Sequence, residues 1–217
     1  MFQKILIASQ NQGKIREIRS LLATDFPQME IISAADLAET KDLDPVETGE
    51  TFTENAELKA RAFARATARQ YPVLADDSGI IVPTLTSNPA HPFPGVYSAR
   101  WYKGTDTDRL RALLTLLREK HPAADLLSAA RIATYECVFC FYNPLARPEQ
   151  VKFFSGNCAG HLAFEPHGSN GFGYDPAFIP DGYEQTFGEL SPEVKNQLSH
   201  RAVALRKLKT FLLTEII

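Results

Sequence analysis

The segment "LADDSGI" (74–80) places two adjacent aspartates inside an apolar run that otherwise has the composition of one buried strand. A buried, unpaired carboxylate costs several kcal/mol unless it is protonated, ion-paired or bound to a metal. Two interpretations are open on this segment alone. Asp, Ser and Gly are favoured in turns, whereas Asp76 and Asp77 in a buried strand need a cation beside them.

A second polar segment, "SQNQGK" (9–14), lies between an expected strand and an expected helix. Ligands of open α/β sheets bind at the carboxyl ends of strands, and helix N-termini favour phosphate. Asn11 and Lys14 could supply a hydrogen-bond donor and a positive charge there. The segment is not a Walker loop, which needs GxxxxGK[ST], and an ordinary solvated loop with a surface lysine is the alternative.

A third segment, "ETGETFTENAELKA" (47–60), brings four glutamates ahead of Lys59. Asn55 and Lys59 are four residues apart and share one face of the helix expected over 51–70. Acidic residues also suit the start of any helix, so Glu47 and its neighbours have an ordinary structural explanation as well.

The C-terminal third contains the glycine-rich segment "GSNGFGYDPAF" (168–178) and the tripeptide "SHR" (199–201). Glycine lets a backbone approach a ligand closely, and an aromatic ring such as Phe172 can stack on a base. His200 and Arg201 add hydrogen-bond donors at the start of the last helix, which Ser199 can cap. Each feature alone also fits a capped helix or a surface loop.

These segments sit on an alternation of strands and helices that predicts an α/β sheet flanked by helices. Residues 83–95 contain four prolines and are expected to form a loop. The expected strands are 4–9, "EIISA", 72–83, 131–142 and 151–164, and the expected helices are "IREIRSLL", 51–70 with Thr51 and Glu54 as a capping box, 107–120, and C-terminal segments, one starting at Ser191-Pro192.

Composition limits the function classes. The 217 residues are 44% hydrophobic and 23% charged, with a net charge of −3 and no basic block, so nucleic-acid binding is not expected. No apolar run approaches the roughly 20 residues of a membrane helix, and the N-terminus lacks the pattern of a signal peptide. We therefore expect a cytoplasmic protein without a membrane partner.

The "CVFC" segment invites a zinc or redox interpretation of Cys137 and Cys140. However, it lies within a β-branched and aromatic run, and residues three apart on a strand point to opposite faces. We expect buried thiols at these positions and at Cys158.

Taken in order, "SQNQGK", "ETGETFTENAELKA", "ADDSG", "PGVYSAR", "FGYDPAF" and "SHRAVALRKL" resemble the inosine triphosphate pyrophosphatase family. The matching blocks extend from about residue 5 to 208. The resemblance implies hydrolysis of non-standard purine nucleoside triphosphates (ITP, dITP, XTP) to the monophosphate and pyrophosphate. It also implies one domain over 1–217, with two lobes around a long mixed sheet, the nucleotide in the cleft between them, and a homodimer.

The resemblance further implies a role for particular residues. Asp77 is the general base and a Mg²⁺ ligand, Asp76 belongs to the same acidic cluster, and Glu47 is the best placement for the remaining metal ligand. Lys59 and Lys14 offset phosphate charge. The expected substrate-binding residues are Ser9, Gln10, Asn11, Lys14, Ser78, Phe172, Gly173, Tyr174, Asp175, Lys195, His200 and Arg201, the last three as donors near the base.

Some positions depart from the family pattern: Ser9-Gln10 replaces a usual Thr-Gly, and the proline-rich loop 83–94 is longer than usual. Two alternatives remain open at this point. One is a pyrophosphatase of the same fold acting on another modified nucleotide, and the other is a nucleotide-binding regulator without turnover.

Overall fold

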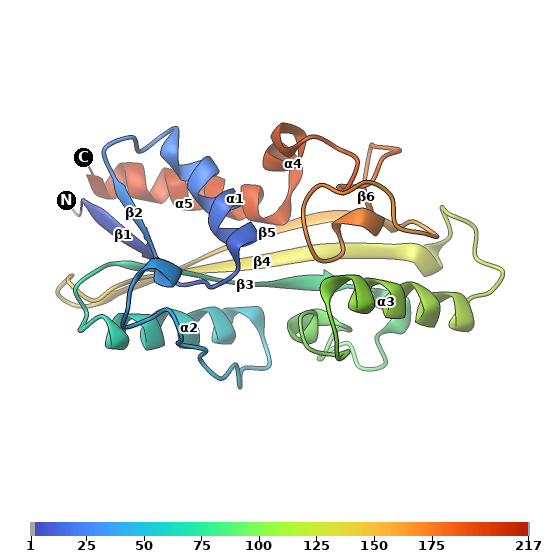
Figure 1. The fold of residues 1–217 in the computed structure, drawn as a ribbon, viewed down its shortest axis with the longest axis horizontal. Coiled ribbons are helices and arrows are strands. Elements are labelled where there is room, and N and C mark those ends of the chain that lie inside the picture. The colour runs from blue at the N-terminus through green and yellow to red at the C-terminus, as the bar shows by residue number, and fades with distance from the viewer. Residues whose placement is uncertain (1–2, 217) are drawn as a thin grey trace. The chain divides into compact units, whose positions relative to one another are not determined.

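The structure, a computed structural model, describes residues 3–216 (Figure 1). Within that range the strands form one six-stranded sheet in the order β2-β1-β3-β4-β5-β6. The first strand is parallel to β2 and β3, whereas β5 and β6 are antiparallel, so the sheet is mixed and the expected α/β class is confirmed. The strands are β1 (Lys4–Ile7), β2 (Glu30–Ser33), β3 (Val73–Ile81), β4 (Ile132–Asn143), β5 (Gln150–Leu162) and β6 (Phe178–Pro180).

The helices between these strands are α1 (Gln12–Ala23), α2 (Phe52–Ala66), α3 (Asp106–Lys120), α4 (Pro192–Leu198) and α5 (His200–Ile216). The capping box of α2 is present, with Thr51 accepting from the Glu54 amide and the Glu54 side chain accepting from Thr51. Ser191 caps α4 as expected. The helix expected over 51–70 ends at Ala66, because Ala68 and Arg69 have φ values of 50° and 60°, which a right-handed helix does not allow.

The aspartate pair lies inside β3, which is continuous from Val73 to Ile81. Leu6 and Ile7 of β1 pair in parallel with Val73 and Leu74. The turn interpretation of this segment is therefore wrong. The reason is tertiary: hydrogen bonding to a neighbouring strand outweighs the turn preference of Asp, Ser and Gly.

The chain divides into two compact units, the first formed by residues 1–77, 137–156 and 201–217 and the second by residues 78–136 and 157–200. In unit 1, α1 and α5 cover one face of the strands and α2 covers the other (Figure 1). Successive core side chains of these strands alternate between the two faces. Ile5, Ile7 and Leu74 pack with α1 and α5. Leu6 and Val73 pack with α2.

In unit 2, one hydrophobic core joins the end of β3 to α3 and to the segment 174–190. The segment 95–98 packs so closely on β3 that a Cβ at Gly79 would lie 2.3 Å from the Gly95 carbonyl oxygen and 2.4 Å from Ser98 Oγ. Ser98 Oγ also accepts from the Ile80 amide at 2.9 Å. Only glycine fits at position 79 without moving this segment.

The three cysteines are free and buried. Cys137 packs with the α1 and α5 side of the sheet and Cys140 with the α2 side, so the expectation of opposite faces is confirmed. Burial raises the pKa of the Cys140 thiol to about 12. Among the helices that the structure describes, none has the length and apolar composition needed to cross a bilayer.

The packing of α5 leads to a stability prediction. Leu208 is fully buried in unit 1, whereas Leu213 of the same helix is 47% exposed. Leu208→Ala should lower the free energy of unfolding by about 2–5 kcal/mol, because it leaves a cavity. Leu213→Ala is the matched control and should change it by about 0.5 kcal/mol or less. Chemical denaturation measures both, and equal losses would contradict this account of the core.

Candidate functional site

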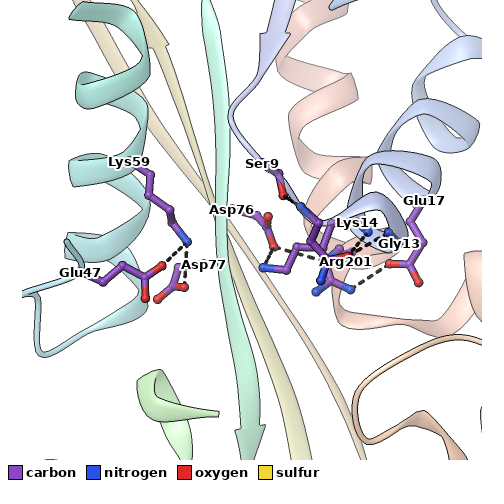
Figure 2. Close-up of polar contacts among 10 residues, drawn as sticks. Ser9, Gly13, Lys14, Glu17, Glu47, Lys59, Asp76, Asp77 and Arg201 are labelled. Carbon is purple, nitrogen blue, oxygen red and sulfur yellow. Dashed lines mark hydrogen bonds and ion pairs between the residues drawn. The ribbon is translucent and has the colours of Figure 1, made fainter. Parts of the chain in front are cut away.

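Asp76 and Asp77 point to opposite faces of β3, as successive residues of a strand must (Figure 2). Asp76 shares the face of Leu74, which is covered by α1 and α5. Asp77 shares the face of Val73 and Ala75, which is covered by α2. Both carboxylates are buried, so each face must supply its own compensation for a buried charge.

On the α2 face, the compensation comes from Lys59. Its Nζ lies 3.0 Å from Asp77 Oδ1 and 2.9 Å from Glu47 Oε1, and its side chain is 12% exposed. Lys59 reaches this position because α2 presents it toward β3, while Asn55, one turn earlier, accepts from the Gly49 amide at 2.8 Å and fixes the segment that carries Glu47. The two residues lie one turn apart on α2, as the helical spacing in the sequence predicts.

At Asp77, the effect of burial on the carboxylate pKa is larger than the opposing effect of the nearby lysine. Burial raises its pKa, the charge of Lys59 lowers it, the neighbouring Glu47 raises it, and the net direction is upward. Burial lowers the pKa of Lys59, but the carboxylates of Asp77, Asp76 and Glu47 together raise it by more. The net direction is upward, so the ammonium stays charged. Asp77 Oδ2 is buried and has no hydrogen-bond partner among the described residues.

On the opposite face, Asp76 Oδ2 contacts Lys14 Nζ at 2.9 Å and Arg201 Nε at 3.3 Å. Arg201 Nη1 contacts Glu17 Oε2 at 2.8 Å (Figure 2). Burial alone would raise the pKa of Asp76, but Lys14, Arg201 and Lys59 lower it to well below its ordinary range. Burial likewise opposes the charge of Arg201, and the carboxylates of Glu17 and Asp76 outweigh it, so the net direction of its pKa is upward.

The loop before α1 positions Lys14. Asn11 caps the helix, since its side-chain oxygen accepts from the Gly13 amide at 2.9 Å and the Lys14 amide at 3.1 Å. Ser9 Oγ accepts from the Asn11 amide at 3.2 Å, and Gln10 Nε2 donates to the Thr40 carbonyl at 2.6 Å. Asn11 is thus a cap, and Lys14 lies in the first turn of a helix whose N-terminus favours anions.

In unit 2, a third buried aspartate organises the C-terminal segments. Asp175 Oδ2 accepts from Lys195 Nζ at 2.7 Å and from the Phe172 amide at 2.7 Å, and Asp175 Oδ1 accepts from the Tyr135 hydroxyl at 3.3 Å. The Lys195 ammonium lies 4.9 Å from the centre of the Phe172 ring. His200 stacks on Tyr135, with ring centres 4.6 Å apart and planes 9° from parallel.

The predicted residues therefore fall into three groups. Unit 1 holds Glu47, Lys59 and Asp77 on one face of β3, and Asn11, Lys14, Asp76 and Arg201 on the other. Unit 2 holds Phe172, Gly173, Tyr174, Asp175, Lys195 and His200, and Ser78 is its half-buried first residue on β3.

The expected cluster of three carboxylates does not form. Glu47 and Asp77 converge on Lys59, whereas Asp76 lies on the other face of β3. Within residues 3–216 there is no group of three or more His, Cys, Asp or Glu side chains arranged to hold a metal ion. A divalent cation at Asp77 would have at most the Glu47 and Asp77 carboxylates as side-chain ligands from this set, with other oxygens from substrate or water.

Sequence reasoning missed Glu17 and Tyr135. Glu17 lies three residues after Lys14 on α1, so helical spacing alone places the two on one face. Its contact with Arg201 joins residues 184 positions apart, which no local pattern reveals. Tyr135 lies within the strand expected over 131–142, and its hydroxyl contact to Asp175 depends on tertiary structure.

Unit 2 also contains a hollow of about 540 Å³ between residues 101–103 and α3. Its walls combine aromatic, aliphatic and both kinds of charged side chain, and none of the predicted site residues lines it. The lining residues are Trp101, Tyr102, Lys103, Asp108, Arg111, Ala112, Thr115, Leu116 and Glu119.

Comparison with known proteins identifies the family. A sequence profile described as the Ham1 family matches residues 5–211. The chain belongs to the Ham1 family. It is 43% identical over 204 residues to a protein of Rhodospirillum centenum named dITP/XTP pyrophosphatase, covering 94% of this chain and 92% of the relative. It is 42% identical over 211 residues to a protein of the same name from Symbiobacterium thermophilum, with the same coverage of both chains.

Solved structures agree with this membership. The Ham1 protein of Staphylococcus aureus is 37% identical and superposes with a TM-score of 0.77, covering 98% of this chain and 99% of the other. A HAM1 protein of Coxiella burnetii is 35% identical, with a TM-score of 0.79 and coverage of 99% and 100%. The family resemblance read from the six sequence blocks is thus confirmed.

Because the ion pairs around Asp76 are buried, their loss should lower the free energy of unfolding by more than the loss of a surface ion pair. Asp76→Asn keeps the side-chain shape but leaves Lys14 and Arg201 with less negative charge, and should lower the free energy of unfolding by about 3–5 kcal/mol. Asp36 pairs with Arg19 at 3.0 Å in an exposed position, so Asp36→Asn is the control, with an expected loss of about 1 kcal/mol or less. Urea unfolding of both variants measures the difference, and a loss at Asp76 as small as that at Asp36 would contradict the proposed network.

Proposed function

We propose that this Ham1-family chain hydrolyses non-standard purine nucleoside triphosphates, such as dITP and XTP, to the nucleoside monophosphate and pyrophosphate. The substrate class rests on the relatives named dITP/XTP pyrophosphatase, which match 94% of the chain. The observation that carries the chemistry is Asp77, a buried carboxylate with a raised pKa and one oxygen without a hydrogen-bond partner among the described residues.

The general base in this proposal is Asp77. Its raised pKa makes the ionised carboxylate a stronger proton acceptor than an exposed aspartate, and the charge of Lys59 favours the ionised form. Asp77 would take a proton from the water that attacks the α-phosphorus. The bond to the β-phosphate breaks, and pyrophosphate leaves.

Glu47 and Asp77 fit a divalent cation, and we propose Mg²⁺. Both are carboxylates, which hard cations prefer, both contact the same ammonium, and Asp77 Oδ2 has no hydrogen-bond partner among the described residues. A bound Mg²⁺ would supply charge neutralisation at the phosphates and bind the attacking water. Asp76 is assigned a different role, as the counter-ion that holds Lys14 and Arg201.

Lys14 and Lys59 are the proposed phosphate ligands. Each is held by carboxylates in a defined position, and Lys14 also lies at a helix N-terminus. Preorganised cations stabilise the charge that develops on the phosphates in the transition state. Arg201 contributes indirectly, because its contacts to Asp76 and Glu17 fix the carboxylate that holds Lys14.

The base would be bound by the unit 2 group. Phe172 offers an aromatic face for stacking, and Lys195 and His200 offer donors suited to the 6-keto oxygen of hypoxanthine or xanthine. Adenine carries an amino donor at that position and would be disfavoured. We also propose, from the family resemblance, that the chain is one domain with two lobes and works as a homodimer in the cytoplasm.

The reaction can be tested directly. Purified protein with ITP and Mg²⁺ in ¹⁸O-labelled water should yield IMP and pyrophosphate, with the label in IMP because the water attacks the α-phosphorus. Mass spectrometry of both products is the measurement, and EDTA should stop turnover. Formation of IDP and orthophosphate would refute the mechanism. Turnover of a modified pyrimidine triphosphate instead of ITP would favour the alternative substrate, and nucleotide binding without turnover would favour a regulator.

The role of Asp77 can be tested by Asp77→Asn, which keeps the shape but removes the base and one negative charge. The expected loss in kcat is about 10²–10⁴-fold, and more where metal binding is also damaged. Asp42→Asn, at an exposed position of the same unit, is the control and should leave kcat unchanged. Near wild-type kcat in the Asp77 variant would remove this residue from the reaction.

A further inference from the structure

The segment 172–175, proposed above to bind the base, forms a turn that its last residue, Asp175, stabilises. Asp175 Oδ2 accepts from the Phe172 amide at 2.7 Å, and Gly171 and Gly173 have φ values of 76° and 63°. These φ values favour glycine, so the sequence Gly-Phe-Gly-Tyr-Asp is suited to this turn. The turn fixes the backbone locally but does not by itself fix where the segment lies in unit 2.

A second set of contacts attaches the segment to residues 98–106. The Gly173 amide donates to Asp106 Oδ2 at 3.2 Å. Trp101 Nε1 donates to the Tyr174 hydroxyl oxygen at 2.7 Å, and the Tyr174 hydroxyl donates to the Ser98 carbonyl at 2.7 Å. Burial raises the pKa of Tyr174 to about 12, so the phenol keeps the proton that it donates. Successive residues of the segment are thus bound from one neighbouring stretch of chain.

The attachment residues are themselves fixed. Trp101 packs edge-on against Phe93, with ring centres 5.1 Å apart. Asp106 lies in the first turn of α3, and its other oxygen accepts from Arg109 Nη2 at 2.6 Å. Ser98 Oγ donates to the Gly95 carbonyl at 2.6 Å, next to the close contact with Gly79. These contacts connect the segment 172–175 to the core of unit 2 through side chains that do not belong to it.

We infer that Trp101 and Asp106 are positioning residues that set base specificity, by fixing Gly173 and Tyr174 relative to the rest of unit 2. This inference rests on the proposed function. Discrimination between a keto and an amino group depends on hydrogen-bonding groups held to within about 0.5 Å. A displacement of about 1 Å can cost up to ~100-fold in rate. Loss of either attachment should therefore weaken discrimination while the fold is kept.

The first test compares kcat/KM for ITP and ATP in four variants. Trp101→Phe removes the Nε1 donor but keeps an aromatic ring, and Asp106→Ala removes the acceptor for the Gly173 amide. Both should lower the ITP-to-ATP ratio by about 10- to 100-fold, mainly through KM for ITP. Two controls should keep the wild-type ratio. Tyr102→Phe changes the neighbouring ring, 5.6 Å from Trp101, and Asp106→Asn retains one acceptor oxygen.

Melting temperatures measured in parallel distinguish loss of specificity from loss of fold. If Trp101→Phe unfolds below the assay temperature, Asp106→Ala decides the question, because Asp106 is 50% exposed and its replacement spares the core. An unchanged ratio in Asp106→Ala, or an equal fall in Asp106→Asn, would overturn the inference.

The second test needs no turnover. Amide hydrogen exchange across 172–175, measured without nucleotide, should be faster in Trp101→Phe and Asp106→Ala than in wild type and unchanged in Tyr102→Phe. Trp101 is the single tryptophan of the chain, so quenching of its fluorescence by IMP but not AMP would report base binding next to it. A wild type that leaves ITP intact would refute the proposed function, whereas unchanged exchange in both variants would refute the positioning role.

Discussion

Successive side chains of a β-strand point to opposite faces, and in β3 this constraint separates two adjacent buried aspartates. Each carboxylate would destabilise the fold by several kcal/mol if it were buried alone. The surrounding elements therefore have to bring a cation to each face. Lys59 comes from α2 on one side, and Lys14 from α1 and Arg201 from α5 come on the other. The placement of three helices is tied in this way to two residues.

The two faces of β3 differ in how completely nearby cations compensate the buried carboxylate. This difference suits Asp76 and Asp77 to different roles. Asp76 contacts two cations and its pKa is lowered, so it remains a charged counter-ion. Asp77 shares one lysine with Glu47, and its pKa is raised. Neighbouring groups whose pKa values are shifted in opposite directions are a common way to divide acid–base roles in one site. Asp77 suits proton transfer, and Asp76 suits support of Lys14.

Much of this arrangement follows from local sequence pattern. The alternation of strands and helices, the caps at Thr51 and Ser191, and the opposite faces of Cys137 and Cys140 all depend on residues within one turn or one strand. The same parity rule separates Asp76 from Asp77. This rule applies only if residues 73–81 form a strand. The turn preference of Asp, Ser and Gly left the conformation of this segment open in the sequence. The place of β3 in the sheet, between β1 and β4, decides the question.

Other features depend on contacts between distant residues. The family resemblance implies that Arg201 is a donor near the base, and in the structure its guanidinium contacts Glu17 and Asp76. The donors Lys195 and His200, close to it in sequence, contact Asp175 and Tyr135 in the other unit. A short motif at a helix start thus carries residues with different roles. Their partners are more than 100 positions away in the case of Arg201 and Asp76, so local pattern could not assign them.

The three groups share one device, a buried aspartate that holds a lysine: Asp76 with Lys14, Asp77 with Lys59 and Asp175 with Lys195. Buried ion pairs are poor sources of stability, because the desolvation of both partners cancels most of their attraction. Their value to this chain lies in preorganisation. A flexible lysine loses about 2 kcal/mol of side-chain entropy when it is fixed, and here that cost is met on folding. In the proposed function, a nucleotide would meet ammonium groups that are already oriented, which is the condition under which fixed charges contribute most to stabilising a transition state.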